Sequence, residues 1–249
     1  MRNPRVLAAR KLLRRSERDR AGAFLVEGPI AVREAVEASA VRDLFVDEGA
    51  PFGSEFLDRG GLAVTRQVIS ALTDTLTPQG VVAVAEARAI DAGAIEGDLV
   101  VVLADVRDPG NAGTLLRSAV AAGSSGVVFA KGSVDPFNPK TVRATAGLLF
   151  RVPVVHDVAL EDALSLLKAR GFLVVGADAG SGVSPDEVDL TRAAALVLGN
   201  ESWGIGAGAR ALLDEVVGIP MPGPAESLNV GIAGSILLFE AVRQRRPRF

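Results

Sequence analysis

The hydrophobic positions of the chain follow two periods, which predict helices and strands in alternation. Beyond residue 98, short apolar runs bounded by glycine or polar residues are typical of buried strands, and we expect strands over 99–104, 126–130, 152–155, 172–177, 194–198 and 216–219. Helical spacing separates them, over 111–122, 139–145, 160–170, 207–213 and 228–244. Strands that are apolar throughout, each followed by a helix, predict an α/β fold with a parallel sheet covered on both faces.

The first ninety residues show the same alternation with shorter elements. Strands are expected over 24–26, 44–46, 63–64 and 81–85, with helices over 6–13, 29–38, 52–59 and 66–72. A small polar stretch, 91–97, is typical of a linker. We therefore predict two domains, 1–90 and 98–249, of which the first is the smaller α/β unit.

Charge is distributed unevenly along the chain. Residues 1–20 carry eight basic and two acidic side chains, and residues 243–248 add four arginines without an acid, although the whole chain has a net charge of −3. Basic ends on an acidic body indicate contact with a polyanion. A solvated helix face and a frayed tail account for the charge pattern equally well.

Composition excludes several kinds of chemistry. The chain has no cysteine, which excludes disulfides, thiolate catalysis and cysteine-ligated zinc. Its single histidine, His156, follows an apolar strand, where a structural role is expected. No His or carboxylate cluster has metal-ligand spacing, so no metal is expected. No apolar run has the length of a membrane span, and the basic N-terminus lacks an apolar signal core, which favours a cytoplasmic protein.

Three loops rich in Gly, Asn and Pro follow strands of the second domain. They span 105–117, 198–206 and 219–229. Each alone is typical of turn chemistry, but ligands of open parallel sheets bind at the carboxyl ends of the strands. Three such loops at one sheet edge therefore predict a binding site. Gly204 to Ala209 matches a dinucleotide fingerprint, but it does not follow its strand directly, so we interpret it as a loop and a helix start.

Together these loops resemble the three motifs of the SpoU-type (TrmH-like) RNA 2′-O-ribose methyltransferases of the SPOUT superfamily. The matching stretches are Asp108–Arg117, Leu196–Glu201 and Ile219–Asn229, in order and at compatible spacing. Arg143–Gly147 is similar to the segment between the first two motifs, and the resemblance covers residues 98–249. Residues 1–90 resemble a ribosomal-protein-type RNA-binding domain often fused to this catalytic domain.

The resemblance implies a fold and a cofactor. The C-terminal domain would contain a trefoil knot, bind S-adenosylmethionine and form a homodimer. The residues that match the family's cofactor cradle are Leu198, Gly199, Ile219, Met221, Leu228 and Asn229.

It also implies a reaction, the transfer of a methyl group to a ribose 2′-hydroxyl. Arg117 matches the family's catalytic arginine, sometimes described as a base. Because arginine stays protonated, we favour electrostatic activation of the hydroxyl. The residues that would orient Arg117, the ribose or the cofactor are Asn111, Glu201, Ser227 and Asn229.

RNA phosphates would contact the basic N-terminal residues Arg10, Lys11, Arg14, Arg15 and Arg18. Arg143 is either a second RNA contact or half of a salt bridge in the dimer. A separate N-terminal domain favours a large folded target, so we expect rRNA ahead of tRNA. The alternatives are a tRNA 2′-O-methyltransferase and a non-catalytic RNA-binding or assembly factor.

Overall fold

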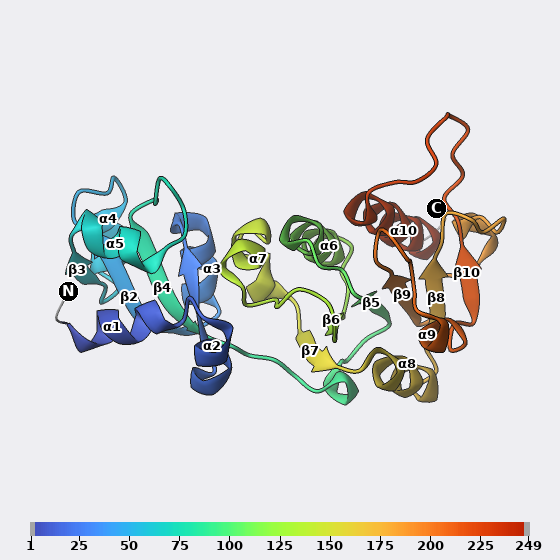
Figure 1. Cartoon of the computed structure of the whole chain (residues 1–249), viewed down its shortest axis with the longest axis horizontal. Coiled ribbons are helices and arrows are strands. Elements are labelled where there is room, and N and C mark those ends of the chain that lie inside the picture. The colour runs from blue at the N-terminus through green and yellow to red at the C-terminus, as the bar shows by residue number, and fades with distance from the viewer. Residues whose placement is uncertain (1–2, 247–249) are drawn as a thin grey trace. The chain divides into compact units, whose positions relative to one another are not determined.

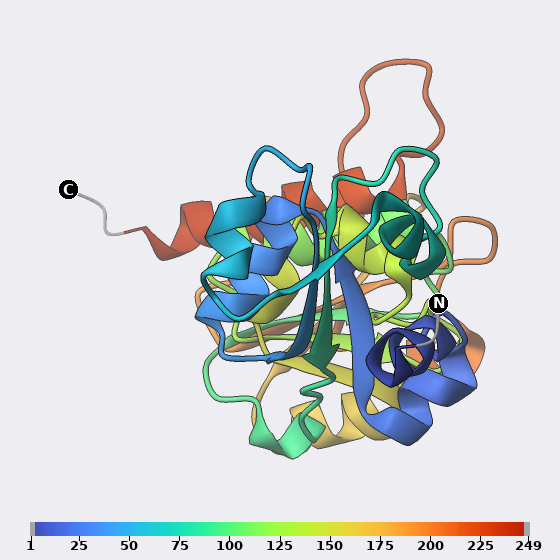
Figure 2. The same ribbon diagram turned by 90° about the vertical axis from the view of Figure 1, so that its left-hand side faces the viewer.

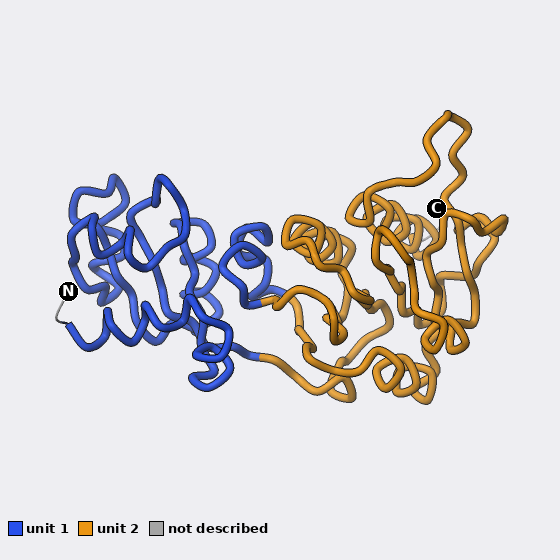
Figure 3. The backbone as a smooth tube through the Cα atoms, in the orientation of Figure 1, with its two compact units in different colours: residues 1–88, 137–151 blue, residues 89–136, 152–249 orange. Residues whose placement is uncertain are grey.

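The computed structural model describes residues 3–246, which form two compact units (Figures 1 and 3). Unit 1 contains residues 1–88 and 137–151, and unit 2 contains residues 89–136 and 152–249. The terminal arginines Arg2 and Arg248 lie outside the described residues. Among the helices within 3–246, none is long and apolar enough to cross a membrane.

Unit 1 is built on a four-stranded sheet of order β1-β4-β2-β3, antiparallel except between β2 and β3. Its strands are β1 (Ala23–Glu27), β2 (Val41–Asp47), β3 (Leu62–Val64) and β4 (Val81–Glu86). Its helices are α1 (Pro4–Lys11), α2 (Arg15–Ala21), α3 (Pro29–Glu37), α4 (Gly53–Leu57), α5 (Arg66–Leu72), α7 (Pro139–Ala144) and the 3₁₀ turn η2 (Leu148–Arg151). Figure 2 shows α3 and α4 on one side of the sheet and α1 and α5 on the other.

The segment 137–151 belongs to unit 1, whereas the sequence places it in the C-terminal domain. The reason is aromatic packing: the ring of Phe24 lies 4.8 Å from that of Phe137 and 5.9 Å from that of Phe150, measured between centroids. Arg151 adds ion pairs to Glu34 and Glu37 of α3. These contacts are non-local, and hydrophobic periodicity does not report them.

Unit 2 contains the predicted parallel sheet, with strand order β10-β8-β9-β5-β6-β7. Its strands are β5 (Leu99–Leu103), β6 (Gly126–Ala130), β7 (Val154–Val158), β8 (Leu173–Ala177), β9 (Ala194–Leu198) and β10 (Glu215–Val217). Its helices are α6 (Pro109–Ala121), α8 (Leu160–Ala169), α9 (Ala207–Arg210) and α10 (Val230–Arg245), with 3₁₀ turns η1 (Ala92–Ala94) and η3 (Pro185–Glu187).

Helices cover both faces of this sheet, as predicted. One face packs α8 and α9, whose buried Leu164, Leu167 and Ala209 meet alternate strand residues such as Val102 and Val197. The other face carries α6 and α10, which lie side by side (Figure 1). The carboxyl ends of β5, β8, β9 and β10 therefore open onto one edge between two helical layers.

Candidate active site

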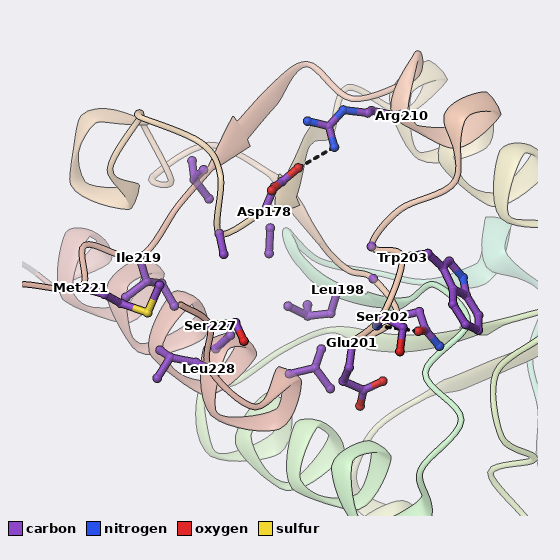
Figure 4. Close-up of a pocket in the computed structure, with 18 residues that line it drawn as sticks. Asp178, Leu198, Glu201, Ser202, Trp203, Arg210, Ile219, Met221, Ser227 and Leu228 are labelled. Atoms are coloured by element: carbon purple, nitrogen blue, oxygen red, sulfur yellow. Dashed lines mark hydrogen bonds and ion pairs between the residues drawn. The ribbon is translucent and has the colours of Figure 1, made fainter. Parts of the chain in front are cut away.

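A cavity of about 350 Å³ lies in unit 2 at the carboxyl ends of three neighbouring strands. Ala177, Leu198 and Val217 end β8, β9 and β10 and contribute to its wall. The loops that follow these strands, together with the approach to α10, complete the lining (Figure 4). This volume is in the range of small-molecule and cofactor sites, and the position is the one expected for a parallel sheet.

Glycine is required where the chain passes closest to itself. A Cβ added at Gly199 would lie 2.5 Å from the carbonyl carbon of Gly204 and 2.8 Å from its oxygen. The turn between them is closed by reciprocal backbone hydrogen bonds between Asn200 and Gly204, of 3.1 and 2.9 Å. The backbone at this wall of the cavity is thus packed without room for a side chain.

A chain of hydrogen bonds joins the three predicted motifs. The Asn229 side-chain oxygen caps α10 by accepting from the backbone N–H of Gly231 at 2.9 Å and that of Ile232 at 3.3 Å. Its amide nitrogen donates to Asn111 Oδ1 at 2.8 Å, and Asn111 Nδ2 donates to Glu201 Oε1 at 2.5 Å. Backbone donors fix one end and a carboxylate fixes the other, so each amide has a single orientation that satisfies its partners.

Arg117 stands apart from this chain of hydrogen bonds. It lies on α6, six residues beyond Asn111, and its side chain is exposed. Within residues 3–246 its guanidinium has neither an ion pair nor a hydrogen bond, so its charge is available to an anionic ligand. Of the five predicted catalytic residues, Glu201 and Ser227 line the cavity, whereas Asn111, Arg117 and Asn229 are not among its described lining residues.

Five of the six residues matched to the cofactor cradle line the cavity, namely Leu198, Gly199, Ile219, Met221 and Leu228. Figure 4 shows Met221 and Leu228 on one side of Leu198, and Trp203 on the other. Asn229, the sixth, uses its side chain to cap α10 instead. Five residues of the predicted set therefore gather at one cavity, and the sixth, Asn229, caps the helix that follows it.

Sequence reasoning missed a fourth loop, which supplies Asp178 directly after β8. Asp178 lines the cavity and accepts hydrogen bonds from Arg210 at 2.5 Å and from the Gly180 N–H at 2.9 Å. These two donors, the Arg210 guanidinium foremost, hold the pKa of the Asp178 carboxyl below its usual value. The available signal was a carboxylate directly after an apolar strand of this sheet.

Comparison with known proteins decides the family. Residues 98–239, more than half of the chain, match the SpoU rRNA Methylase family. The chain belongs to this family. Residues 3–83 match the MRM3-like substrate binding domain.

Two relatives that align along most of this SpoU protein are named as enzymes that act on 23S rRNA. It is 34% identical over 240 residues to the 23S rRNA (guanosine(2553)-2′-O)-methyltransferase RlmP of Bacillus subtilis (strain 168), covering 95% of each chain. It is 35% identical to the 23S rRNA (uridine(2479)-2′-O)-methyltransferase of Streptomyces viridochromogenes, covering 93% of this chain and 86% of that one. The predicted resemblance to SpoU-type enzymes is confirmed.

A solved relative confirms the fold. The SpoU methyltransferase AviRb from Streptomyces viridochromogenes, crystallised in complex with the cofactor AdoMet, superposes with a TM-score of 0.89 at 35% identity, covering 98% of each chain. The parallel sheet with an added N-terminal domain is thus the architecture expected of the family. Within residues 3–246, no group of three or more His, Cys, Asp or Glu side chains is arranged to hold a metal ion.

The predicted RNA contacts differ in availability. Arg10, Lys11, Arg14 and Arg15 are exposed on α1, α2 and the turn between them. Arg18 is only 4% exposed and donates to the carbonyl oxygens of Leu12 and Leu13, at 3.0 and 3.2 Å. Arg18 donates to carbonyl groups that follow α1 and is buried, so the prediction that it contacts RNA is wrong.

Arg143 forms ion pairs within its own unit. We had expected it either to contact RNA or to form a salt bridge in the dimer. Its Nη1 bonds to Asp74 and lies 3.4 Å from Glu27 Oε2. Thr75 donates to the other oxygen of Glu27 at 2.6 Å. Arg143 therefore ties α7 to the loop before β4, and its hydrogen bond holds the pKa of the Asp74 carboxyl below its usual value.

Proposed function

We propose that this SpoU protein transfers a methyl group from S-adenosylmethionine to a ribose 2′-hydroxyl of ribosomal RNA. The observation that carries the proposal is the hydrogen-bonded series Glu201–Asn111–Asn229, which joins all three motifs beside the cavity. Two relatives named as 23S rRNA 2′-O-methyltransferases, each aligned over more than nine-tenths of this chain, support the choice of rRNA. The cytoplasm, where ribosomes are assembled, is then its place of action.

The cavity fits the cofactor chemically. Leu198, Ile219, Met221 and Leu228 offer apolar walls for an adenine, and close-packed backbone at Gly199 brings peptide groups to its edges. Asp178, held anionic by Arg210, would accept hydrogen bonds from hydroxyl or amino groups. When bound, S-adenosylmethionine supplies an electrophilic methyl group on a sulfonium.

The residues around the cavity would position and activate the ribose. Asn111 uses one oxygen of Glu201, which leaves the second carboxylate oxygen to accept a hydrogen bond from a ribose hydroxyl. Arg117 stays protonated, so we assign it the electrostatic role of stabilising negative charge that develops on the 2′-oxygen or of holding the adjacent phosphate. Ser227 lines the cavity and adds a hydroxyl to the same groups. Orientation of the attacking oxygen is then the main contribution of Asn111 and Asn229.

We propose a homodimer formed through α10. Ile232 and Phe239 are 51% and 47% exposed, and Ile236 between them is also exposed. Their spacing of four and three residues places them on one helix face. An exposed apolar stripe of this kind is typical of a protein interface.

We also infer the trefoil knot implied by the resemblance. From β9 the chain continues to β10, which lies beyond β8 in the sheet, and α10 then returns to pack against β9 and α6.

The experiment is transfer of labelled methyl from S-adenosylmethionine to unmodified total RNA, separated into rRNA and tRNA. The expected result is label in rRNA with the wild type and none with Arg117→Ala. Arg192→Ala is the matched control, because this exposed arginine precedes β9, at the opposite edge of the sheet. Label in tRNA alone would favour the tRNA enzyme. Cofactor binding without transfer to either RNA would favour the non-catalytic factor.

A further inference from the structure

Trp203, the only tryptophan of the chain, is 56% exposed although indole is the largest apolar side chain. It lies in the turn closed by Asn200 and Gly204, two residues after Glu201. Figure 4 shows its ring at the rim of the cavity, on the side away from Met221 and Leu228. The indole therefore borders both the cavity, which Glu201 also lines, and open solvent.

The ring is held in one orientation by polar groups. Trp203 Nε1 donates to Asp105 Oδ2 at 3.1 Å. The same carboxylate accepts from Arg107 Nε at 2.8 Å and from Arg107 Nη2 at 3.2 Å. The Arg107 guanidinium carbon in turn lies 4.9 Å from the centre of the Trp203 ring, in cation–π contact.

Asp105 is itself fixed by its backbone. It adopts a left-handed conformation, with φ +62°, two residues beyond Leu103, the buried end of β5. Its carbonyl oxygen accepts from Asn200 Nδ2 at 2.9 Å, so the loop after β5 is tied to the turn that carries Trp203. A Cβ at Gly132 would lie 2.8 Å from Asp105 Oδ1, and this close approach confines the carboxylate from another side.

An indole that is exposed and also rigid is suited to ligand binding. Burial does not explain its position, and its N–H is already satisfied by Asp105. Stacking on an aromatic side chain is the usual way in which proteins hold an unpaired RNA base, and a pre-oriented ring loses little entropy on binding. We propose that Trp203, oriented by Asp105 and Arg107, stacks on a base of the RNA substrate beside the methylated ribose. This inference rests on the proposed function.

The geometry also defines what the stacked base contributes. Every base has a π face, so stacking on Trp203 tolerates any base and positions the nucleotide without selecting it. The Asp105 carboxylate already accepts three hydrogen bonds, two from Arg107 and one from Trp203, so we assign it the role of holding the ring and not that of recognising a base edge. Loss of the ring is therefore expected to raise the KM for RNA, by about 5- to 150-fold given the usual strength of base–aromatic stacking.

Trp203 reports on the contact directly, because the chain has one tryptophan and no tyrosine. Tryptophan emission is followed while in vitro transcribed 23S rRNA is added to the wild type. Quenching of this emission is expected. It should be lost with a synthetic RNA fragment that is abasic at the methylated nucleotide, as located by the labelling experiment, and at its two neighbours. Unchanged emission at saturating RNA, or equal quenching by the abasic fragment, overturns the proposal. So does quenching by S-adenosylmethionine alone with no further change on RNA addition.

Kinetics of two variants separate stacking from packing. Trp203→Phe retains an aromatic face and should keep the KM for RNA within a few fold, whereas Trp203→Leu retains bulk without the face and should raise it. Calorimetric affinity for S-adenosylmethionine and the thermal midpoint check that both variants are folded. Equal KM values for the wild type and Trp203→Leu overturn the platform while leaving the methyltransferase intact. Absence of methyl transfer by the wild type instead refutes the proposed function, and the emission titration then decides the RNA contact alone.

Discussion

One amide, that of Asn229, both caps α10 and directs the bonds that hold Glu201, and two substitutions separate these effects. Its oxygen accepts from two backbone N–H groups at the start of a helix of 16 residues. Its nitrogen donates to Asn111, which passes its own donor to Glu201. Asn229→Ala removes both functions, whereas Asn229→Asp keeps the cap, because aspartate caps helices as well as asparagine does.

The expected magnitudes differ for the two variants. Asn229→Ala should lower the free energy of unfolding by about 0.5–2 kcal/mol, the usual cost of losing a helix cap. For a chain of this size, each kcal/mol lowers the melting temperature by roughly 2–4 °C. Asn229→Asp should stay within about 0.5 kcal/mol of the wild type, because its charge is favourable at a helix N-terminus.

Activity should respond to Asn229→Asp although stability does not. A carboxylate at position 229 has no donor for Asn111 Oδ1, so the Asn111 amide turns its nitrogen towards it and its oxygen towards Glu201. Glu201 then loses its donor. A hydrogen bond to a charged group contributes roughly 1.5–3 kcal/mol, which corresponds to about a 10- to 150-fold lower kcat/KM. Methyl transfer and thermal unfolding are measured on the same preparations. Full activity of Asn229→Asp would refute the role of this hydrogen-bonded series.

Three further predictions follow from single contacts. Gly199→Ala places a methyl group 2.5 Å from the Gly204 backbone and should abolish calorimetric binding of S-adenosylmethionine; retained affinity would mean that the turn moves freely. Arg143→Gln should lower the free energy of unfolding by up to about 1 kcal/mol at neutral pH. The reason is that Arg143 lowers the pKa of Asp74 in the folded state, and this stabilises the fold at pH values above the unfolded-state pKa of Asp74, near 4. The difference in unfolding free energy between the wild type and Arg143→Gln, measured by urea unfolding, should vanish as the pH falls through the folded-state pKa of Asp74. A difference that persists in acid would exclude the ion pair as its source. Phe239→Glu should yield monomers in sedimentation velocity, and an unchanged dimer would place the interface elsewhere.

The strands of unit 2 are predictable from sequence because each is buried on both faces and leaves a continuous apolar run, as Leu99–Leu103 does. Element ends are less predictable. The last helix was expected from residue 228, but it begins at Val230 because the Asn229 side chain caps it. The last strand was expected over 216–219 but spans Glu215–Val217, because the Gly218 N–H donates to Val183 O, which lies outside the neighbouring strand β8.

Residues whose roles depend on non-local contacts could not be assigned from sequence. Arg18 reads as one more charge of a basic stretch, yet its burial against Leu12 and Leu13 depends on how α2 follows α1. Arg143 forms a hydrogen bond with Asp74, which lies 69 residues earlier in the chain. Asp178 and Trp203 belong to loops whose neighbours are set by strand order, which periodicity does not reveal. The three loops were predictable because each follows an apolar strand and is rich in Gly, Asn and Pro, whereas the roles of their residues came from the resemblance to the SpoU-type enzymes.

The return of residues 137–151 to unit 1 has a consequence for folding during synthesis. Domains commonly fold one after another as the chain leaves the ribosome, at about 5–20 residues per second. Here the partners of Phe24 emerge only after residues 89–136 of the other unit, so β1 waits several seconds with an uncovered aromatic face. Nascent chains arrested before residue 137 should therefore engage chaperones more strongly than chains arrested after residue 151 has left the exit tunnel.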